Sequence, residues 1–122
     1  MSQSKKTLVL GASENPNRYS FLAIKSLAAH GHPIVAIGKL MGQVEGITIN
    51  KEVQQEPDID TITLYLNPAH QKQYYDYILS LNPKRVIFNP GAENSELASL
   101  CRNNNIEVVY GCTLVMLSTN QF

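Results

Sequence analysis

Short apolar runs alternate along the chain with longer segments in which apolar residues recur at helical spacing. Five runs have the length and composition of buried strands, and each is followed by glycine, asparagine or proline: 7–10, 33–37, 62–66, 85–88 and 106–110. Between them, apolar residues three or four positions apart predict helices within 21–28, 74–81 and 97–101. Uniformly apolar strands separated by helices are typical of a parallel sheet covered on both faces.

The stretch 40–60 departs from this alternation. It contains Gly42 and Gly46, two short β-like pieces and an acidic polar segment. We interpret it as an irregular crossover with room for a small extra strand pair and a weak helical turn. The fold expected for residues 1–122 is one three-layer, Rossmann-like α/β domain, doubly wound around a mostly parallel five-stranded sheet.

Charge and cysteine content narrow the function classes. Basic and acidic residues both number 10, so the formal charge is zero and lacks the excess typical of nucleic-acid proteins. A single anionic ligand needs only a local cluster and stays possible. Two cysteines form no disulfide framework, and no apolar run resembles a signal peptide or a membrane span. We therefore expect a cytoplasmic protein that binds neither nucleic acid nor membrane.

The loop after the first apolar run, residues 11–20, lies where an open parallel sheet binds its ligands, beyond the carboxyl ends of the strands. It reads G-A-S-E-N-P-N-R-Y-S, and Gly11 permits a sharp turn and a close approach to a ligand. Arg18, the only cation of the loop, precedes a helix whose first N–H groups favour anions. Hydroxyls and amides complete the set (Ser13, Ser20, Asn15, Asn17). This composition predicts a phosphate-binding loop rather than a plain connection.

The kind of phosphate is less defined by these residues. The loop lacks the glycines of the G-x-G-x-x-G dinucleotide fingerprint and the G-K-[ST] of a P-loop. Where a NAD site has an acidic residue at the end of the second strand, this chain has Gly38 and Lys39. A lysine suits a ribose that carries its own phosphate. Coenzyme A with its 3′-phosphate and NADP with its 2′-phosphate both fit.

The string G-A-S-x-N-P-x-R-x-S resembles the first-loop motif of the small single-domain CoA-binding proteins, which are similar to the CoA-binding domain of the succinyl-CoA ligase α subunit. The resemblance covers essentially the whole chain. It includes Gly46, the Asn67–Pro68 pair, the segment 88–94 (F-N-P-G-A-E-N) and Cys112, in that order.

The resemblance implies that coenzyme A or an acyl-CoA is the ligand. Its pyrophosphate and neighbouring groups would be held by the first loop, at Gly11, Ala12, Ser13, Asn15, Pro16, Arg18 and Ser20. Lys39, next to Gly38, would lie near the adenosine 3′-phosphate. The cleft would be lined further by Asn67, Pro68, Pro90 and Gly91.

Residues that would carry chemistry are sparse. The sequence shows no base–nucleophile pair with an orienting group and no metal cluster, and the expected cleft holds only the carboxylates of Glu14 and Glu93. The ligases that the chain resembles phosphorylate a histidine in a separate domain. We therefore favour a sensor, carrier or regulatory module that binds CoA without chemistry of its own. The alternatives are an NADP- or other nucleotide-dependent enzyme on the same fold and an interaction protein whose cleft has decayed.

Four side chains outside the loop invite a chemical role and are given a structural one. His30 and His32 flank Gly31 at a helix end, where they are expected to cap the helix rather than bind metal. Cys101 is expected in the core. Cys112, at the cleft end of the last strand, is expected to pack rather than react.

The segment 113–122 carries no charge and contains four consecutive apolar residues at 114–117. It predicts a short helix against the sheet or a subunit interface. Together with the tyrosine-rich helix within 74–81, it suggests a homodimer.

Overall fold

The computed structural model describes residues 4–122 as one α/β unit built on a seven-stranded sheet. The strands are β1 (Thr7–Leu10), β2 (Ile34–Ile37), β3 (Gly42–Val44), β4 (Ile47–Asn50), β5 (Thr61–Leu64), β6 (Arg85–Phe88) and β7 (Glu107–Tyr110). Their order is β3-β4-β2-β1-β5-β6-β7, and every neighbouring pair is parallel except β3 and β4. The predicted doubly wound, mostly parallel fold is confirmed.

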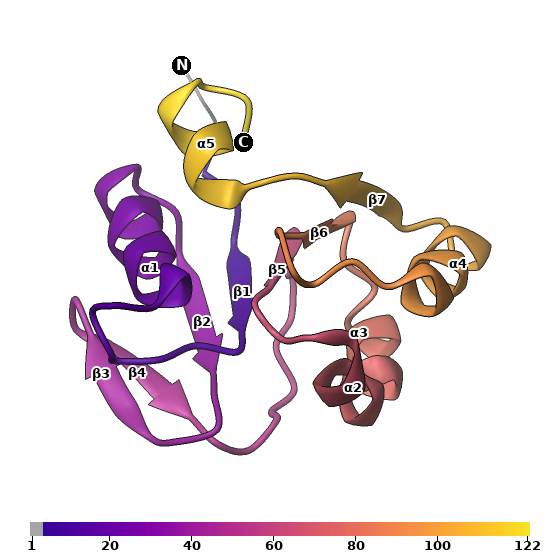
Figure 1. Cartoon of the computed structure of the whole chain (residues 1–122), viewed down its shortest axis with the longest axis horizontal. Helices are drawn as coiled ribbons and strands as arrows, with labels where there is room; N and C mark the ends of the chain where they lie inside the picture. Colours follow the sequence, from indigo (N-terminus) through magenta and orange to yellow (C-terminus); the bar gives the residue numbers. More distant parts are fainter. Residues whose placement is uncertain (1–3) are drawn as a thin grey trace.

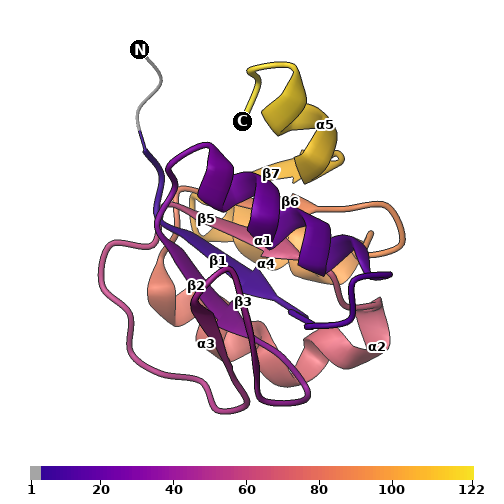
Figure 2. The same ribbon diagram turned by 90° about the vertical axis from the view of Figure 1, so that its left-hand side faces the viewer.

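Helices cover both faces of this sheet (Figures 1 and 2). One face carries α1 (Tyr19–Ala29) and α5 (Thr113–Ser118), and the other carries α2 (Pro68–Gln71), the short 3-10 helix η1 (Lys72–Tyr74), α3 (Tyr75–Leu81) and α4 (Ser95–Asn103). The central strand β1 shows why: Leu8 and Leu10 face one layer, and Val9 between them faces the other. Each layer therefore has its own apolar core.

The sheet has seven strands where five were predicted, because the stretch 40–60 contributes a hairpin. Strands β3 and β4 pair antiparallel across a turn in which Glu45 and Gly46 both adopt positive φ, at 52° and 76°. That conformation suits the twist of a two-residue hairpin loop. The extra strand pair that the sequence left room for is thus present, whereas no helical turn forms in residues 51–60.

The helix predicted within 74–81 is present as α3, and α2 and η1 precede it as two further short helical segments. Its tyrosines, Tyr74, Tyr75 and Tyr77, are partly buried against the core, as a packing stripe predicts. The helix ends at Asn82, whose φ of 47° is left-handed, immediately before Pro83.

The chain reverses its winding at β1. From β1 it builds outward through β2 and β4, and it then returns to place β5 on the other side of β1. The loops after β1 and β5 consequently diverge and leave a crevice at the carboxyl ends of these strands.

No helix within residues 4–122 combines the length and apolar character that crossing a membrane requires.

Candidate functional site

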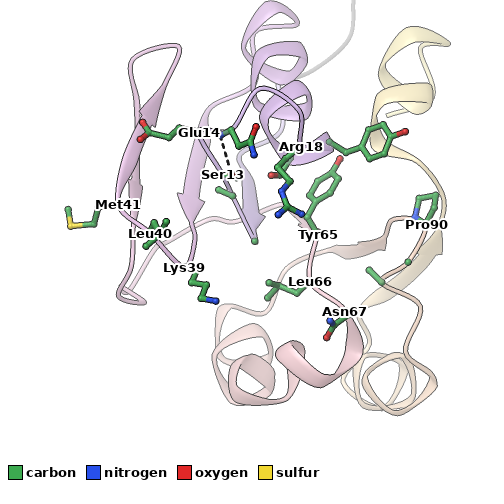
Figure 3. A pocket seen from close by; sticks show the side chains of 17 residues that line it. Ser13, Glu14, Arg18, Lys39, Leu40, Met41, Tyr65, Leu66, Asn67 and Pro90 are labelled. Carbon is green, nitrogen blue, oxygen red and sulfur yellow. Dashed lines mark hydrogen bonds between the residues drawn. The ribbon is translucent and has the colours of Figure 1, made fainter.

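A cavity of about 710 Å³ opens at this crevice (Figure 3). It is lined by the loops that follow β1, β2, β5 and β6. Of the thirteen residues predicted from the sequence, ten line it: Gly11, Ala12, Ser13, Asn15, Arg18, Ser20, Lys39, Asn67, Pro90 and Gly91. Ten of the thirteen residues thus share one cavity, and their binding roles stay predictions.

The first loop begins with a turn that only glycine makes without strain. Gly11 has a φ of 95°, and a Cβ there would lie 3.0 Å from the carbonyl carbon and oxygen of Tyr65. The N–H groups of Gly11 and Ala12 both donate to the Ile37 carbonyl at 2.9 Å. These two donors fix the loop to β2 and are not available to a ligand.

Gly38, directly after β2, makes room for the first loop. It is buried, and a Cβ there would lie 2.2 Å from the Ala12 carbonyl oxygen. The absence of a side chain at position 38 therefore allows the first loop to lie directly on the end of β2. Gly38 is outside the cavity wall, as are the exposed Pro16 and Pro68, which opens α2.

Internal hydrogen bonds shape the rest of the loop. The Ser13 hydroxyl accepts the Asn15 N–H at 3.0 Å, and the Asn15 side-chain oxygen accepts the Asn17 N–H at 3.0 Å. The N–H groups of Ser13 and Glu14 meet no acceptor within residues 4–122. The loop thus presents two backbone donors, and the Ser13 hydroxyl keeps its own proton for a ligand acceptor.

Arg18 stands at the mouth of α1. It has extended backbone (φ −96°, ψ 142°) and its side chain makes no capping bond, so the first N–H groups of α1 stay free of a side-chain acceptor. Figure 3 shows the guanidinium directed into the cavity, close to Tyr65. Within the described chain it forms neither an ion pair nor a hydrogen bond. A cation and the positive end of a helix therefore meet at one spot.

The opposite wall is formed by Lys39, Leu40 and Met41, between β2 and β3. Leu40 and Met41 are 73% and 63% exposed, although both are large apolar side chains. The Lys39 side chain extends towards the cavity and has no acidic partner among the described residues. This wall offers apolar surface beside a free ammonium group.

The third side of the cavity comes from the loops after β5 and β6. Asn67 caps α2 by accepting the His70 N–H at 3.1 Å, which leaves its amide NH₂ without a partner in residues 4–122. Gly91 has a φ of 93° and donates its N–H to Glu93 at 2.9 Å. The Glu93 carboxylate is thus engaged in its own loop.

A buried polar network supports the floor. The Asn89 amide donates to the Thr63 hydroxyl at 2.7 Å and to the Leu64 carbonyl at 2.8 Å, and its oxygen accepts the Thr113 N–H at 2.9 Å. Thr63 and Thr113 share a further bond at 2.8 Å. These bonds tie β5, β6 and the start of α5 together beneath the cleft.

Tyr65 lies beside this network and lines the cavity with its ring. Burial raises the pKa of its hydroxyl to about 12, an effect that the nearby Thr113 and Thr63 hydroxyls partly offset. The phenol therefore stays protonated near neutral pH. Neither these hydroxyls nor any other group within residues 4–122 meets the phenol in hydrogen-bonding geometry.

Seven further residues line the cavity without having been predicted as binding residues. Glu14 was noted only as a carboxylate, and the others carried no assignment: Tyr19, Leu40, Met41, Tyr65, Leu66 and Ala92. Most of them directly follow a strand or adjoin a predicted residue, so their place at the carboxyl end of the sheet was the available signal.

The histidines and cysteines lie away from the cavity wall. His30 caps α1 as predicted, with Nδ1 2.7 Å from the Ser26 carbonyl. His32 does not, because its Nδ1 accepts the Lys5 N–H at 2.9 Å. Cys101 is buried as predicted, which raises its pKa to about 11, whereas Cys112 is only partly buried and immediately precedes α5.

The winding of the sheet, the glycine turn after β1 and the crevice at the switch point define a Rossmann-like α/β protein. A family model described as "CoA binding domain" matches residues 5–118. The chain belongs to this family, as the resemblance of its first loop implied. A search of the curated proteins found no match.

Several solved structures are similar to this chain. A protein described only as uncharacterized is 52% identical, with a TM-score of 0.97 over 99% of this chain and 100% of its own. A hypothetical protein from Pyrococcus horikoshii OT3 is 22% identical, with a TM-score of 0.85 over 98% and 84% of the two chains. A protein from Thermus thermophilus is 20% identical, with a TM-score of 0.83 over 98% and 92%. The last two show the fold alone.

Proposed function

We propose that the cleft binds coenzyme A or an acyl-CoA and that the protein acts as a sensor, carrier or regulatory module. Membership of the CoA binding domain family supports a CoA-type ligand. The observation that carries the proposal is the Arg18 guanidinium, which has no side-chain partner within residues 4–122 and is directed into the cavity at the start of α1. Arginine forms charge-assisted, often bidentate bonds with phosphate oxygens.

The pyrophosphate would lie between Arg18 and the free backbone donors at Ser13 and Glu14. This arrangement differs from the expected one, since the N–H groups of Gly11 and Ala12 are already bonded to Ile37. The loop therefore contributes a turn, two backbone donors and a hydroxyl, and Arg18 contributes the charge.

The adenosine end would lie against the wall formed by Lys39, Leu40 and Met41. Exposed apolar side chains beside a free ammonium suit a planar base and the phosphate on its ribose. The pantetheine arm would then run past Arg18 towards Asn67 and Gly91, on the other side of the cavity.

The charged and phenolic side chains around the cavity support binding more than catalysis. The described residues that line it include Glu14, Arg18, Lys39 and two tyrosines, but no histidine or cysteine. The Tyr65 phenol holds its proton too firmly to act as a base near neutral pH.

NADP is the second candidate, because Lys39 stands where NAD enzymes carry an acidic residue and would equally suit a 2′-phosphate. Calorimetric titration with CoA, acetyl-CoA, NADP and NAD tests both. We expect CoA to bind and NAD not to bind. Binding of NADP without CoA would overturn the proposal in favour of the alternative.

A homodimer stays a prediction. Val115 on α5 and Tyr110 on β7 are 57% and 50% exposed, so the uncharged C-terminal region keeps apolar surface on the outside. Leu117, by contrast, is buried in the core of the protomer.

A further inference from the structure

Glu14 is the one acidic side chain among the described residues that line the cavity. Its Oε2 accepts the Gln43 N–H of strand β3 at 3.0 Å, across 29 positions of sequence. A carboxylate beside a polyanionic ligand opposes binding through its charge. The bond to β3 gives this side chain a different part to play.

The contact with β3 is close on its other side as well. A Cβ added at Gly42 would lie 2.6 Å from the Glu14 carboxyl carbon and 2.7 Å from Oε2. Gly42 does not have positive φ, so its backbone conformation does not demand glycine. The space it leaves allows the carboxylate to lie against the strand and reach the Gln43 N–H.

The hairpin that Glu14 contacts packs on the core through Val44 and Ile49, but its hydrogen-bonded attachment to the sheet is short. Strand β3 is at the edge of the sheet and pairs only with β4, and β4 pairs with β2 through just two residues, Ile49 and Asn50. The salt bridge between Lys25 and Glu45, at 3.9 Å, joins two exposed side chains and adds little. The Glu14 bond is therefore a cross-brace between the first loop and the hairpin.

Leu40 and Met41 lead directly into this hairpin, so its position sets the distance between their wall and the first loop. We propose that Glu14 is a positioning residue, which holds the β3–β4 hairpin through Gln43 at the spacing that the adenosine end of CoA requires. The inference rests on the proposed function and adds a determinant of affinity outside the phosphate contacts.

Two substitutions separate the brace from the charge. Glu14→Ala and Glu14→Gln both remove the negative charge, but glutamine keeps an oxygen that can accept the Gln43 N–H. We expect Glu14→Ala to bind CoA about three- to tenfold more weakly than Glu14→Gln, within the range of one hydrogen bond. Adenosine 3′,5′-bisphosphate, measured by competition, should show the same ratio, and 4′-phosphopantetheine should show none.

Gly42→Ala approaches the same contact from the other side. In the wild-type background it should weaken CoA binding, and in the Glu14→Ala background it should have no further effect, because the displaced group is gone. The melting temperatures of the variants serve as the control for folding.

Equal CoA affinity of the Glu14→Ala and Glu14→Gln proteins would overturn the brace and leave the proposed function intact. Equal losses for 4′-phosphopantetheine and the bisphosphate would also overturn it, since the effect would not be confined to the adenosine end. Failure of the wild-type protein to bind CoA would overturn both proposals.

Discussion

The positively charged side chains at the two ends of the sheet differ in their burial and in their contacts. At the amino end, Arg85 is buried, its Nε donates to the Thr61 hydroxyl at 2.7 Å, and its guanidinium carbon lies 4.4 Å from the centre of the Phe122 ring. At the carboxyl end, Arg18 and Lys39 are exposed beside the cavity and have no acidic partner within residues 4–122. Cations thus close one end and stay available at the other.

The closed end is held by a cluster of four residues, Lys5, His32, Arg85 and Phe122. The Lys5 ammonium donates to the Phe122 carbonyl at 2.7 Å, and the Lys5 N–H donates to His32. The His32 and Phe122 rings lie 4.9 Å apart. The two cations of this cluster, Lys5 and Arg85, contact hydroxyl, carbonyl and aromatic groups. The Nη2 of Arg85 makes no hydrogen bond among the described residues.

This difference predicts where each substitution acts. A cation whose side chain packs within the folded protein should affect the free energy of unfolding and leave ligand affinity unchanged. A cation that is free at the cleft should affect affinity and leave stability unchanged. Four predictions test this separation, in order of expected size.

The largest effect is expected from Arg85→Ala, which removes a buried side chain, its bond to Thr61 and its contact with Phe122. We expect it to lower the free energy of unfolding by about 2–4 kcal/mol. Arg85→Met, which keeps most of the volume and removes the buried charge, should cost much less. Urea denaturation measures both, and wild-type stability of Arg85→Ala would contradict the structural role.

The second prediction concerns Arg18→Ala at the open end. We expect CoA affinity to fall by about 1.5–3 kcal/mol, the range for hydrogen bonds to charged groups, or roughly ten- to a hundredfold in Kd. The affinity for dephospho-CoA should fall by the same factor, because the pyrophosphate is common to both ligands. Calorimetry with an unchanged melting temperature is the test, and unchanged affinity would mean that the first loop is only a connection.

The features that could be predicted from the sequence were those with a local signal. The uniformly apolar strands and helical spacing identified the parallel sheet, and a glycine directly after β1 identified the loop at its open end. Those signals are local. The hairpin at 42–50 was only allowed for, because its strands are short and its turn uses a glutamate at positive φ, an uncommon choice.

Contacts between distant segments carried no such signal. His30 and His32 looked alike beside Gly31, yet one bonds within its own helix and the other bonds to Lys5, 27 positions away. The close approach of Gly38 to Ala12 was likewise invisible in the pattern, although the residue itself had been singled out. Tertiary packing decides these roles.

The third prediction uses the pH dependence of the closed end. Burial, reinforced by His30, Lys5 and Arg85, lowers the pKa of His32 from 6.5, and Asp60 opposes this shift only partly. The folded state therefore binds this proton less readily than the unfolded state. The contribution of His32 to stability is complete above pH 6.5 and is lost as pH falls through 6.5 towards the lower folded-state pKa.

Protonation also removes the lone pair that accepts the Lys5 N–H. We expect an acid-dependent loss of about 0.5–1.5 kcal/mol, the net value of one hydrogen bond. His32→Asn offers an oxygen close to the position of Nδ1 and does not titrate, so it should remove this step from the profile of stability against pH. His30→Asn is the control: the step should stay but become smaller, because His30 contributes to the lowering of the His32 pKa.

The smallest effect is expected from Lys39→Ala, and it tests whether the open end reads two separate phosphates. Lys39 is exposed, so its attraction for a phosphate is worth about 0.2–1 kcal/mol, or roughly 1.4- to fivefold in Kd. Its position on the opposite wall from Arg18 places it with the adenosine end in our proposal. The loss should therefore appear with CoA and vanish with dephospho-CoA.

Because the attraction is electrostatic and exposed, it should also shrink between 50 mM and 500 mM salt as the Debye length shortens, to about 4 Å at the higher concentration. Arg18 is exposed as well, so the effect of Arg18→Ala should also shrink with salt, but its direct hydrogen bonds to the pyrophosphate should keep it the larger of the two effects. Calorimetry on both variants with both ligands distinguishes these cases. An equal loss of CoA and dephospho-CoA affinity in Lys39→Ala would mean that both cations serve the pyrophosphate, and the ligand would then lie across the cleft rather than along it.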